Sequence, residues 1–330
     1  MKYRKLGKSG LKVSEISLGA WLTYGGSVED QTAIKCLHTA LENKINFIDV
    51  ADAYAKGKAE RVVGIALEEA QYSRNELVLS SKVFWPITDN AINNVGLSRK
   101  HIFDSIENSL DRFNVDYLDM YFCHRFDNNT PIEETAMAMH DLVRDGYVRY
   151  WGTSVWSAKQ IERVIGVCKE HKLILPAVEQ PKYNMLDRTI ELEIMESAVY
   201  HGLGLVVWSP LAGGVLTGKY NTGIPENSRA GSGNNFIKND MTEEKLVKVK
   251  AIGDVASKLG ITTGQLALAW ILRKSEISSV ITGATVPEQV LENIKASDVN
   301  LDNDIIQQIE EILGNKPIFP GPYSPVMLNR

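Results

Sequence analysis

The sequence predicts an α/β protein, a closed (β/α)8 TIM barrel that forms one domain over residues 1–330. Short apolar runs of strand length alternate eight times with helical patterns, and no change in composition marks a domain boundary. Three of the runs end on an ionisable residue, which suits parallel strands whose carboxyl ends meet at one active face. The alternation fills the roughly 250 residues that such a barrel needs. A doubly wound sheet shows the same alternation, but the unbroken composition favours the closed barrel.

A β-hairpin precedes the repeating part of the chain. Residues 3–15 hold two short strand-like runs around the turn Gly7-Lys8-Ser9-Gly10, whose residue types are those of a hairpin turn. The eight barrel strands are expected at residues 16–20, 46–51, 77–83, 117–123, 148–152, 176–180, 204–208 and 278–282.

Helices are expected wherever apolar residues recur at three- and four-residue spacing between these strands. Ser98, Ser157 and Thr242 precede three such patterns and are residue types that cap helix starts. The expected helices are residues 30–43, 58–71, 98–113, 131–145, 157–171, 187–201, 242–259 and 287–297, with an extra C-terminal helix at 302–313. A long polar, glycine-rich loop at 209–241 follows the seventh strand, and long loops on this face usually close over ligands.

Composition excludes several classes of function. The net charge of −5 and the pI of about 5.8 give no basic excess for nucleic acid or an anionic membrane. No apolar run is long enough for a signal peptide or a membrane span, so we expect a cytoplasmic protein without membrane insertion. The three cysteines, Cys36, Cys123 and Cys168, form no CxxC pair, and the histidines lack metal-like spacing. We therefore predict no disulfide framework and no metal site.

Four polar residues follow expected strands at their carboxyl ends. Asp49 ends one strand and Tyr54 follows in the next turn, Lys82 ends the second, and His124 follows the third. Taken singly, each residue can be explained without a function: Lys82 as an exposed strand-end lysine, for example, and His124 as a core histidine. Their order on successive strand ends favours a shared site, because parallel strand ends lie on one face.

These four residues suit the reduction of a carbonyl group. A lysine ammonium beside a tyrosine stabilises the phenolate, so Lys82 is expected to lower the pKa of Tyr54 and make it a usable acid. Asp49 would keep Lys82 charged, and His124 would donate a hydrogen bond to the same carbonyl oxygen. The oxygen then takes a proton while hydride reaches the carbon, and hydride requires a cofactor.

Motifs spread over nearly the whole chain resemble those of the aldo-keto reductases. They are Asp49-x-Ala-x-x-Tyr54, Ser80-Ser81-Lys82, His124 after its apolar run, Trp151-Gly152-Thr153-Ser154, Glu179-Gln180, Trp208-Ser209-Pro210-Leu211-Ala212, Gly283-Ala284-Thr285 and Glu292-Asn293. Within that family, residues 57–60, 96–101, 150–154 and 314–317 are most similar to the potassium-channel β-subunit branch and its microbial relatives.

The resemblance implies a catalytic tetrad of Asp49, Tyr54, Lys82 and His124, and NADP(H) as the cofactor. The residues that it places around the cofactor are Trp21, Ser154, Gln180, Trp208, Ser209, Pro210, Leu211, Ala212, Gly213, Lys219, Arg229, Gly283, Thr285, Gln289, Glu292 and Asn293. Within this set, Ser154 and Gln180 match positions that bind the nicotinamide carboxamide, and Trp208 matches the residue that stacks on the ring.

Two positions depart from patterns known in the family. Many aldo-keto reductases have arginine where this chain has Gln289, which leaves a strict preference for NADP(H) over NAD(H) open, although Lys219 and Arg229 offer other cations. Animal channel β-subunits have asparagine where this chain has His124, and the histidine favours an active enzyme.

We therefore expect an NADP(H)-dependent reductase of aldehydes or ketones with Tyr54 as the proton donor. The alternatives are a cofactor-sensing regulatory protein with slow turnover, like the channel β-subunits, and a barrel with a non-redox activity. The expected partner is a small carbonyl substrate, and relatives in the channel branch suggest a homotetramer. Tyr24, Trp85, Phe126 and Trp156 lie just past strand ends and are candidates for an apolar substrate wall, with core packing as the equal alternative for each.

Overall fold

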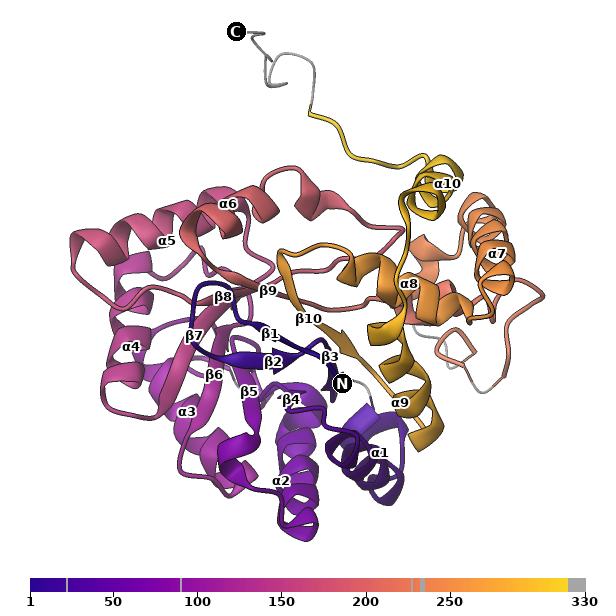
Figure 1. Cartoon of the computed structure of the whole chain (residues 1–330). Coiled ribbons are helices and arrows are strands. Elements are labelled where there is room, and N and C mark those ends of the chain that lie inside the picture. Colours follow the sequence, from indigo (N-terminus) through magenta and orange to yellow (C-terminus); the bar gives the residue numbers. More distant parts are fainter. Residues whose placement is uncertain (22, 90, 227, 232–234, 320–330) are drawn as a thin grey trace, which may run out of the picture.

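Eight parallel strands close into a barrel in the order β10-β3-β4-β5-β6-β7-β8-β9 (Figure 1). The computed structural model describes residues 1–21, 23–89, 91–226, 228–231 and 235–319. The barrel strands are β3 (Ile16–Gly19), β4 (Phe47–Asp49), β5 (Val78–Val83), β6 (Leu118–Cys123), β7 (Val148–Ser154), β8 (Val178–Gln180), β9 (Gly204–Val207) and β10 (Ile277–Thr282). The last strand pairs with the first, with Val280 opposite Ile16, so the predicted (β/α)8 fold is confirmed.

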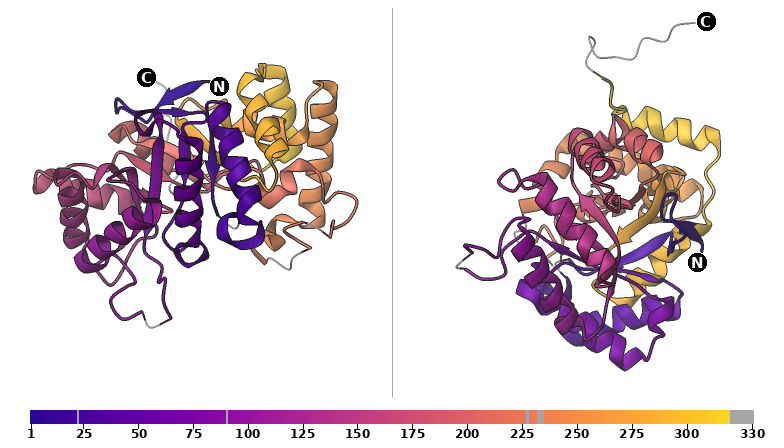
Figure 2. Two further views of the ribbon diagram at one scale, coloured as in Figure 1. Left: turned by 90° about the horizontal axis from the view of Figure 1, so that it is seen from below. Right: turned by 90° about the vertical axis from the view of Figure 1, so that its left-hand side faces the viewer.

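Helices surround the barrel, as the two views of Figure 2 show. They are α1 (Asp30–Glu42), α2 (Lys58–Ala70), α3 (Arg99–Phe113), α4 (Ile132–Arg144), α5 (Ala158–Glu170), α6 (Ile194–His201), α7 (Glu243–Lys258), α8 (Thr263–Leu272), α9 (Pro287–Ile294) and α10 (Asn303–Leu313). Short turns of tighter or wider helix are η1 (Thr23–Ser27), η2 (Tyr54–Gly57), η3 (Arg74–Glu76), η4 (Thr189–Glu191), η5 (Ala212–Thr217), η6 (Asn235–Asp240) and η7 (Lys295–Asp298).

The N-terminal hairpin closes one end of the barrel. Strands β1 (Tyr3–Lys5) and β2 (Lys12–Ser14) pair antiparallel, as predicted. Leu6 and Val13 are completely buried and pack with apolar side chains from the strands inside the barrel. In the left view of Figure 2 the hairpin lies at the opposite end from the long loop after β9. The carboxyl ends of the strands therefore remain open for a site.

Among the described residues, helix α8 is the one α-helix that the spacing of apolar residues did not predict. Nine of its ten residues, Gly264 to Leu272, are buried. A helix that is apolar all round has no polar face, so it lacks the periodicity on which the prediction depended. Its start does carry a signal, because Thr262 and Gln265 form a reciprocal capping box.

The expected helix at 187–201 is also divided in the structure. A single turn, η4, precedes α6, and the backbone at Glu193 between them is not helical, with φ −137° and ψ −36°. Among the described residues no single helix is both long and apolar enough to cross a membrane; α7 and α8 reach that length only as a pair bent by 91°.

Candidate active site

The four predicted catalytic residues meet at the carboxyl ends of three neighbouring strands. Asp49 is the last residue of β4, Lys82 lies near the end of β5, and His124 directly follows β6. Tyr54 opens the turn η2, and its backbone N–H donates to the Ala51 carbonyl at 3.1 Å. The strand register therefore brings together residues that are far apart in the sequence.

Lys82 is the centre of the site. Its side chain is completely buried, and its Nζ lies 2.8 Å from Asp49 Oδ2 and 3.3 Å from the Tyr54 hydroxyl. A third contact, at 2.5 Å, goes to the carbonyl of Val50. Burial alone would lower the pKa of Lys82, but Asp49 and Tyr54 outweigh burial and raise the pKa. The ammonium is therefore charged at neutral pH.

Asp49 uses both carboxylate oxygens in hydrogen bonds. Its Oδ2 accepts from Lys82, while its Oδ1 accepts from Ser80 Oγ at 2.8 Å and from Gln180 Nε2 at 2.9 Å. The residue is 3% exposed, so these partners replace the water that a carboxylate would otherwise bind. This network fixes Asp49, and through it the position of the Lys82 ammonium. It also links the predicted catalytic residues to Gln180, a predicted cofactor residue.

The pKa of Tyr54 moves in the direction opposite to the prediction. Burial raises the pKa and is the largest effect, Lys82 lowers it, and Asp49 raises it again. The predicted net decrease is therefore wrong. A buried phenolate loses its hydration, and Asp49 cancels part of the charge that Lys82 provides. Tyr54 consequently stays protonated at neutral pH and has a proton to donate.

His124 lies beside Tyr54 as a neutral ring. The two ring centroids are 5.8 Å apart in an edge-on arrangement. Burial, followed by the charges of Lys82 and Arg125, holds the pKa of His124 well below its usual range. Among the described residues, no group bonds its buried Nδ1. The ring thus keeps hydrogen-bonding capacity that the described side chains do not use.

Arg125 is a functional candidate that the sequence analysis missed. One guanidinium nitrogen donates to the His124 carbonyl at 2.5 Å, and the group lies 5.9 Å from the centre of the Trp85 ring. Burial lowers the pKa of Arg125, while Tyr54 and Glu179 act in the opposite direction. Its place directly after His124 was the available signal, but a charged residue after a strand is too common to be diagnostic.

Two fully buried acids lie close to this network. Burial, reinforced by Glu60, raises the pKa of Asp52 to about 7, although a hydrogen bond from Ser105 at 2.7 Å opposes the increase. Burial also raises the pKa of Glu179 to about 7, despite a hydrogen bond from Thr153. Glu179 is part of the quoted Glu179-Gln180 motif, and Asp52 falls at an unspecified position of the Asp49–Tyr54 motif. Sequence spacing gave no indication that either acid is buried.

The Asp52 carboxyl group is expected to make stability depend on pH. Its pKa in the folded chain, about 7, exceeds the value of about 3.9 in an unfolded chain. Between these values the folded chain holds a proton that the unfolded chain has lost. The stabilisation is therefore complete below about pH 4 and is lost as the pH rises through about 7. Asp52→Asn should reduce the change in the free energy of unfolding over this pH range by an amount on the order of a few kcal/mol.

Urea unfolding at several pH values between about 5 and 8 measures this effect. Asp116, an exposed residue, provides the control Asp116→Asn, which should keep the slope of the wild-type protein. Equal slopes in Asp52→Asn and in the wild-type protein would contradict the assignment of the titration to Asp52.

The predicted nicotinamide residues surround the same strand ends. Ser154 ends β7 and donates from Oγ to the carbonyl of Gln180, at the end of β8, at 3.0 Å. Trp208 follows β9 and meets Trp21 edge-on, with ring centroids 6.4 Å apart. The guanidinium of Arg229 lies 5.6 Å from the centre of the Trp21 ring. These residues therefore connect β7, β8 and β9 with the long loop.

The backbone after Trp208 forms a tightly bent cradle. Ser209, Ala212, Gly213 and Gly214 all have positive φ, at 56°, 48°, 66° and 100°. A Cβ added to Gly213 would lie 2.2 Å from Cγ2 of Ile237, so only glycine fits there. Pro210 is buried and Leu211 half-buried beside this run. The missing Cβ atoms of Gly213 and Gly214 leave room for the side chains of Ile237 and Lys219. Successive backbone N–H groups in a run of this kind can bind an anion.

The remaining predicted cofactor residues follow β10, lie on α9 or belong to the long loop after β9. Gly283, Thr285 and Gln289 are exposed after β10 and on α9, and Gln289 Oε1 accepts from the Thr285 backbone N–H at 2.8 Å. Asn293 is 6% exposed, and Glu292 is half-buried. The last of the predicted cofactor residues is Lys219, which is exposed and lies 5.2 Å from the Tyr220 ring centre.

The four predicted substrate residues divide into two pairs. Tyr24 and Trp156 are each 1% exposed and belong to the main hydrophobic core. Trp85 is 44% exposed, and Phe126 is half-buried with its ring centre 4.8 Å from that of Trp156. Trp85 and Phe126 are therefore the members available to a substrate. Within the described residues, no three His, Cys, Asp or Glu side chains are grouped to hold a metal ion.

Comparison with known proteins places this chain in a family. The model of the aldo/keto reductase family matches residues 15–314. A protein of Arabidopsis thaliana named "Probable voltage-gated potassium channel subunit beta" is 44% identical over 98% of this chain and 100% of its own length. A protein of the same name from Oryza sativa subsp. japonica is 42% identical over 96% of this chain and 98% of its own. With its matching barrel, the chain therefore belongs to the aldo/keto reductase family.

Proposed function

We propose that this protein reduces aldehydes or ketones to alcohols, with NADP(H) as the hydride donor and Tyr54 as the proton donor. One observation carries the proposal: the buried ammonium of Lys82 contacts both Asp49, at 2.8 Å, and the Tyr54 hydroxyl, at 3.3 Å. Carbonyl reduction creates negative charge on oxygen, and this arrangement supplies a proton and a fixed positive charge for it.

Each residue of the tetrad has a separate task. Tyr54 is protonated at neutral pH and gives its proton to the carbonyl oxygen, although burial raises its pKa and makes it a weaker acid. Lys82 stabilises the phenolate that remains, and Asp49 keeps Lys82 charged and in place. His124 is neutral and therefore donates a hydrogen bond to the substrate oxygen without adding a charge.

The cofactor residues of this chain have the chemistry that a nicotinamide dinucleotide needs. When bound, the reduced nicotinamide supplies the hydride. Ser154 and Gln180 offer polar groups to its carboxamide beside Asp49, and Trp208 offers an aromatic face. The bent cradle at 209–214 would hold the pyrophosphate, and Lys219 and Arg229 would provide positive charge for a 2′-phosphate.

A regulatory function is the second candidate, and the names of the two plant relatives favour it. In that case the protein would bind NADP(H), turn over slowly and report the redox state of the cofactor to a membrane-channel partner. The tetrad is the same for both functions, so the two differ in rate rather than in residues.

Oxidation of NADPH in the presence of para-nitrobenzaldehyde or methylglyoxal tests the proposal. The enzyme function predicts turnover with both NADPH and a carbonyl present and none without the carbonyl. NADH measured in parallel shows whether Gln289 permits the use of NAD(H). Tight binding of NADPH without turnover of any carbonyl would instead support the regulatory function, and failure to bind either cofactor would contradict both.

A further inference from the structure

Arg125 brings a positive charge next to the tetrad. It directly follows His124 at the carboxyl end of β6, and its Nη1 donates to the His124 carbonyl at 2.5 Å. Burial is the largest influence on the pKa of Tyr54 and on that of His124, and in both cases Arg125 acts to lower the pKa. The guanidinium is therefore close enough to act on a small molecule that binds at the tetrad.

Glu179 does not neutralise this charge. Its two carboxylate oxygens accept hydrogen bonds elsewhere, from Thr153 Oγ1 at 2.5 Å and from the Trp156 backbone N–H at 3.2 Å. Burial also raises the pKa of Glu179 to about 7, so a large share of this group is protonated and uncharged at neutral pH. Glu179 consequently gives Arg125 no full negative charge as a partner.

Asp127, two residues after Arg125, also binds other groups. Its Oδ2 accepts from the Leu97 backbone N–H at 2.8 Å and from Thr130 Oγ1 at 2.7 Å, and its Oδ1 accepts from the Asn129 backbone N–H at 2.8 Å. Across the described ranges of the chain, no carboxylate lies within ion-pair distance of the Arg125 guanidinium, and its Nε and Nη2 make no hydrogen bond. One edge of the guanidinium can therefore bind an anion.

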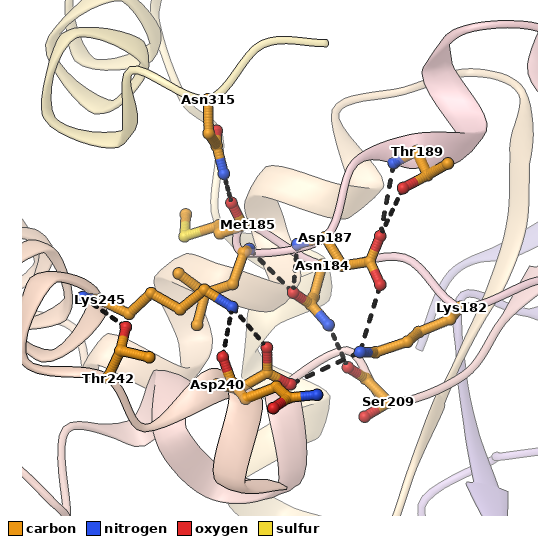
Figure 3. Close-up of polar contacts among 12 residues, drawn as sticks. Lys182, Asn184, Met185, Asp187, Thr189, Ser209, Asp240, Thr242, Lys245 and Asn315 are labelled. Atoms are coloured by element: carbon orange, nitrogen blue, oxygen red, sulfur yellow. Dashed lines mark hydrogen bonds and ion pairs between the residues drawn. The ribbon is translucent and has the colours of Figure 1, made fainter. Parts of the chain in front are cut away.

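Other cations at this face of the barrel do have carboxylate partners. Lys82 lies 2.8 Å from Asp49 Oδ2. Lys182, just past β8, lies 3.2 and 3.5 Å from carboxylate oxygens of two aspartates (Figure 3). Burial lowers the pKa of Arg125, which shows that its charge has lost part of its hydration. A bound anion would compensate for this loss, as the carboxylates do for the two lysines.

Two aromatic side chains lie beside the guanidinium. The centre of the Trp85 ring is 5.9 Å from the guanidinium carbon, a distance typical of a cation–π contact, and Trp85 is 44% exposed. Phe126 follows Arg125 directly in the sequence and is half-buried against Trp156. Trp85 and Phe126 are the two candidate substrate residues that remain available, so a ligand there would meet apolar surface and a positive charge together.

We propose that Arg125 determines substrate specificity by pairing with a carboxylate, so that the protein reduces aldehydes or ketones that also carry a carboxylate group. The inference rests on the proposed function and names the substrate class for the same site. A planar guanidinium binds a carboxylate through two parallel hydrogen bonds, and Nε with Nη2 provides such an edge. Hydride still goes to the carbonyl carbon and the Tyr54 proton to its oxygen, while the carboxylate does not react.

Two substrates of the same shape but different charge test the inference. 4-Formylbenzoate and para-nitrobenzaldehyde differ only in carrying a carboxylate or a nitro group, and only the carboxylate is negative. Arg125→Gln removes the charge and keeps an amide donor, so kcat/KM for 4-formylbenzoate should fall about 10- to 100-fold, mainly through KM. The value for para-nitrobenzaldehyde should change by less than about threefold, because a neutral group forms no ion pair. Arg125→Lys keeps the charge without the planar edge, so its loss should be intermediate.

A second substrate pair and a binding measurement extend the test. The flexible pair 4-oxobutanoate and butanal repeats the comparison, because a benzene ring fixes the distance between the two groups and an alkyl chain does not. Binding is measured by calorimetry with the protein saturated with NADP⁺, which has no hydride to transfer. 4-Formylbenzoate should bind the wild-type protein about 10- to 100-fold more tightly than Arg125→Gln. Added salt should weaken this binding more in the wild-type protein than in the variant.

Arg163→Met is the matched control. Arg163 is an exposed residue of α5 that lines the same surface cavity as Phe126, so it places a positive charge in the same region. This substitution should leave the preference between the two aldehydes unchanged. An equal loss for 4-formylbenzoate in Arg163→Met would show that any nearby cation is sufficient, and it would overturn the specific pairing with Arg125.

An unchanged preference in Arg125→Gln would also overturn the inference. The ratio of kcat/KM between the charged and the neutral aldehyde would then equal that of the wild-type protein in both substrate pairs. Values that fall equally for both aldehydes would show that Arg125 only supports His124 through its carbonyl. A wild-type protein that reduces neither kind of aldehyde would contradict the proposed function, whereas reduction of both with an unchanged ratio in Arg125→Gln would contradict only the role of Arg125.

Discussion

Tyr54→Phe is expected to slow carbonyl reduction by about 10²–10⁴-fold while cofactor binding is retained. The substitution removes only the hydroxyl group, which lies 3.3 Å from Lys82 Nζ and is the proton donor of the proposed reaction. The ring that packs edge-on against His124 remains. The loss should therefore appear in kcat, because a proton is transferred in the transition state rather than on binding.

The measurement is the initial rate of NADPH oxidation with para-nitrobenzaldehyde. Binding of NADPH, followed through tryptophan fluorescence from Trp21 and Trp208, shows whether the site is intact. Tyr200→Phe is a suitable control, because Tyr200 lies on α6 and is 76% exposed. This substitution should change neither the rate of NADPH oxidation nor the binding of NADPH. A Tyr54→Phe protein that kept more than about half of the wild-type kcat would exclude Tyr54 as the proton donor.

Lys82→Met is expected to reduce both activity and stability. The substitution leaves the Asp49 carboxylate buried without its positive partner, and breaking a buried ion pair in this way typically costs about 3–5 kcal/mol. Ser80 and Gln180 still donate to Asp49, which places the loss toward the lower end of that range. Activity should fall as well, because the phenolate of Tyr54 loses the charge that stabilises it.

Urea unfolding and NADPH oxidation together test the Lys82 prediction. The double variant Asp49→Asn/Lys82→Met should recover part of the lost stability, since no unpaired charge remains, but none of the activity. Lys100→Met removes an exposed ion pair with Asp104 and should cost no more than about 0.5 kcal/mol. A Lys82→Met protein as stable as the Lys100→Met control would contradict the prediction that loss of the buried pair with Asp49 destabilises the folded chain.

The alternation of strands and helices was readable from the sequence because it depends on local patterns. Runs such as 77–83 and 117–123 are apolar over the length of a strand, and the structure has β5 and β6 there. The tetrad followed from the same patterns, since residues at the ends of parallel strands share one face. Helix α8 escaped detection because its burial on every side removes the periodicity that reveals a helix.

The properties that the sequence did not reveal depend on burial and on distant contacts. The pKa of Tyr54 was predicted in the wrong direction because sequence shows the neighbouring lysine but not the loss of water. The pKa values near 7 of Asp52 and Glu179 have the same origin. The hydrogen bond from Gln180 to Asp49 joins residues 131 positions apart, and sequence spacing gave no indication of it.

Closure of the barrel has a consequence for the nascent chain. Strand β3 pairs with β10, and Arg4 of the hairpin donates to the carbonyls of Lys274 and Leu272, 270 and 268 residues further along the chain. These contacts cannot form on the ribosome until nearly the whole sequence has emerged. One edge of β3 therefore stays unpaired through most of synthesis, and an unpaired edge invites association with other chains. We expect closure to be a late step, with a yield that falls as the concentration of refolding chains rises.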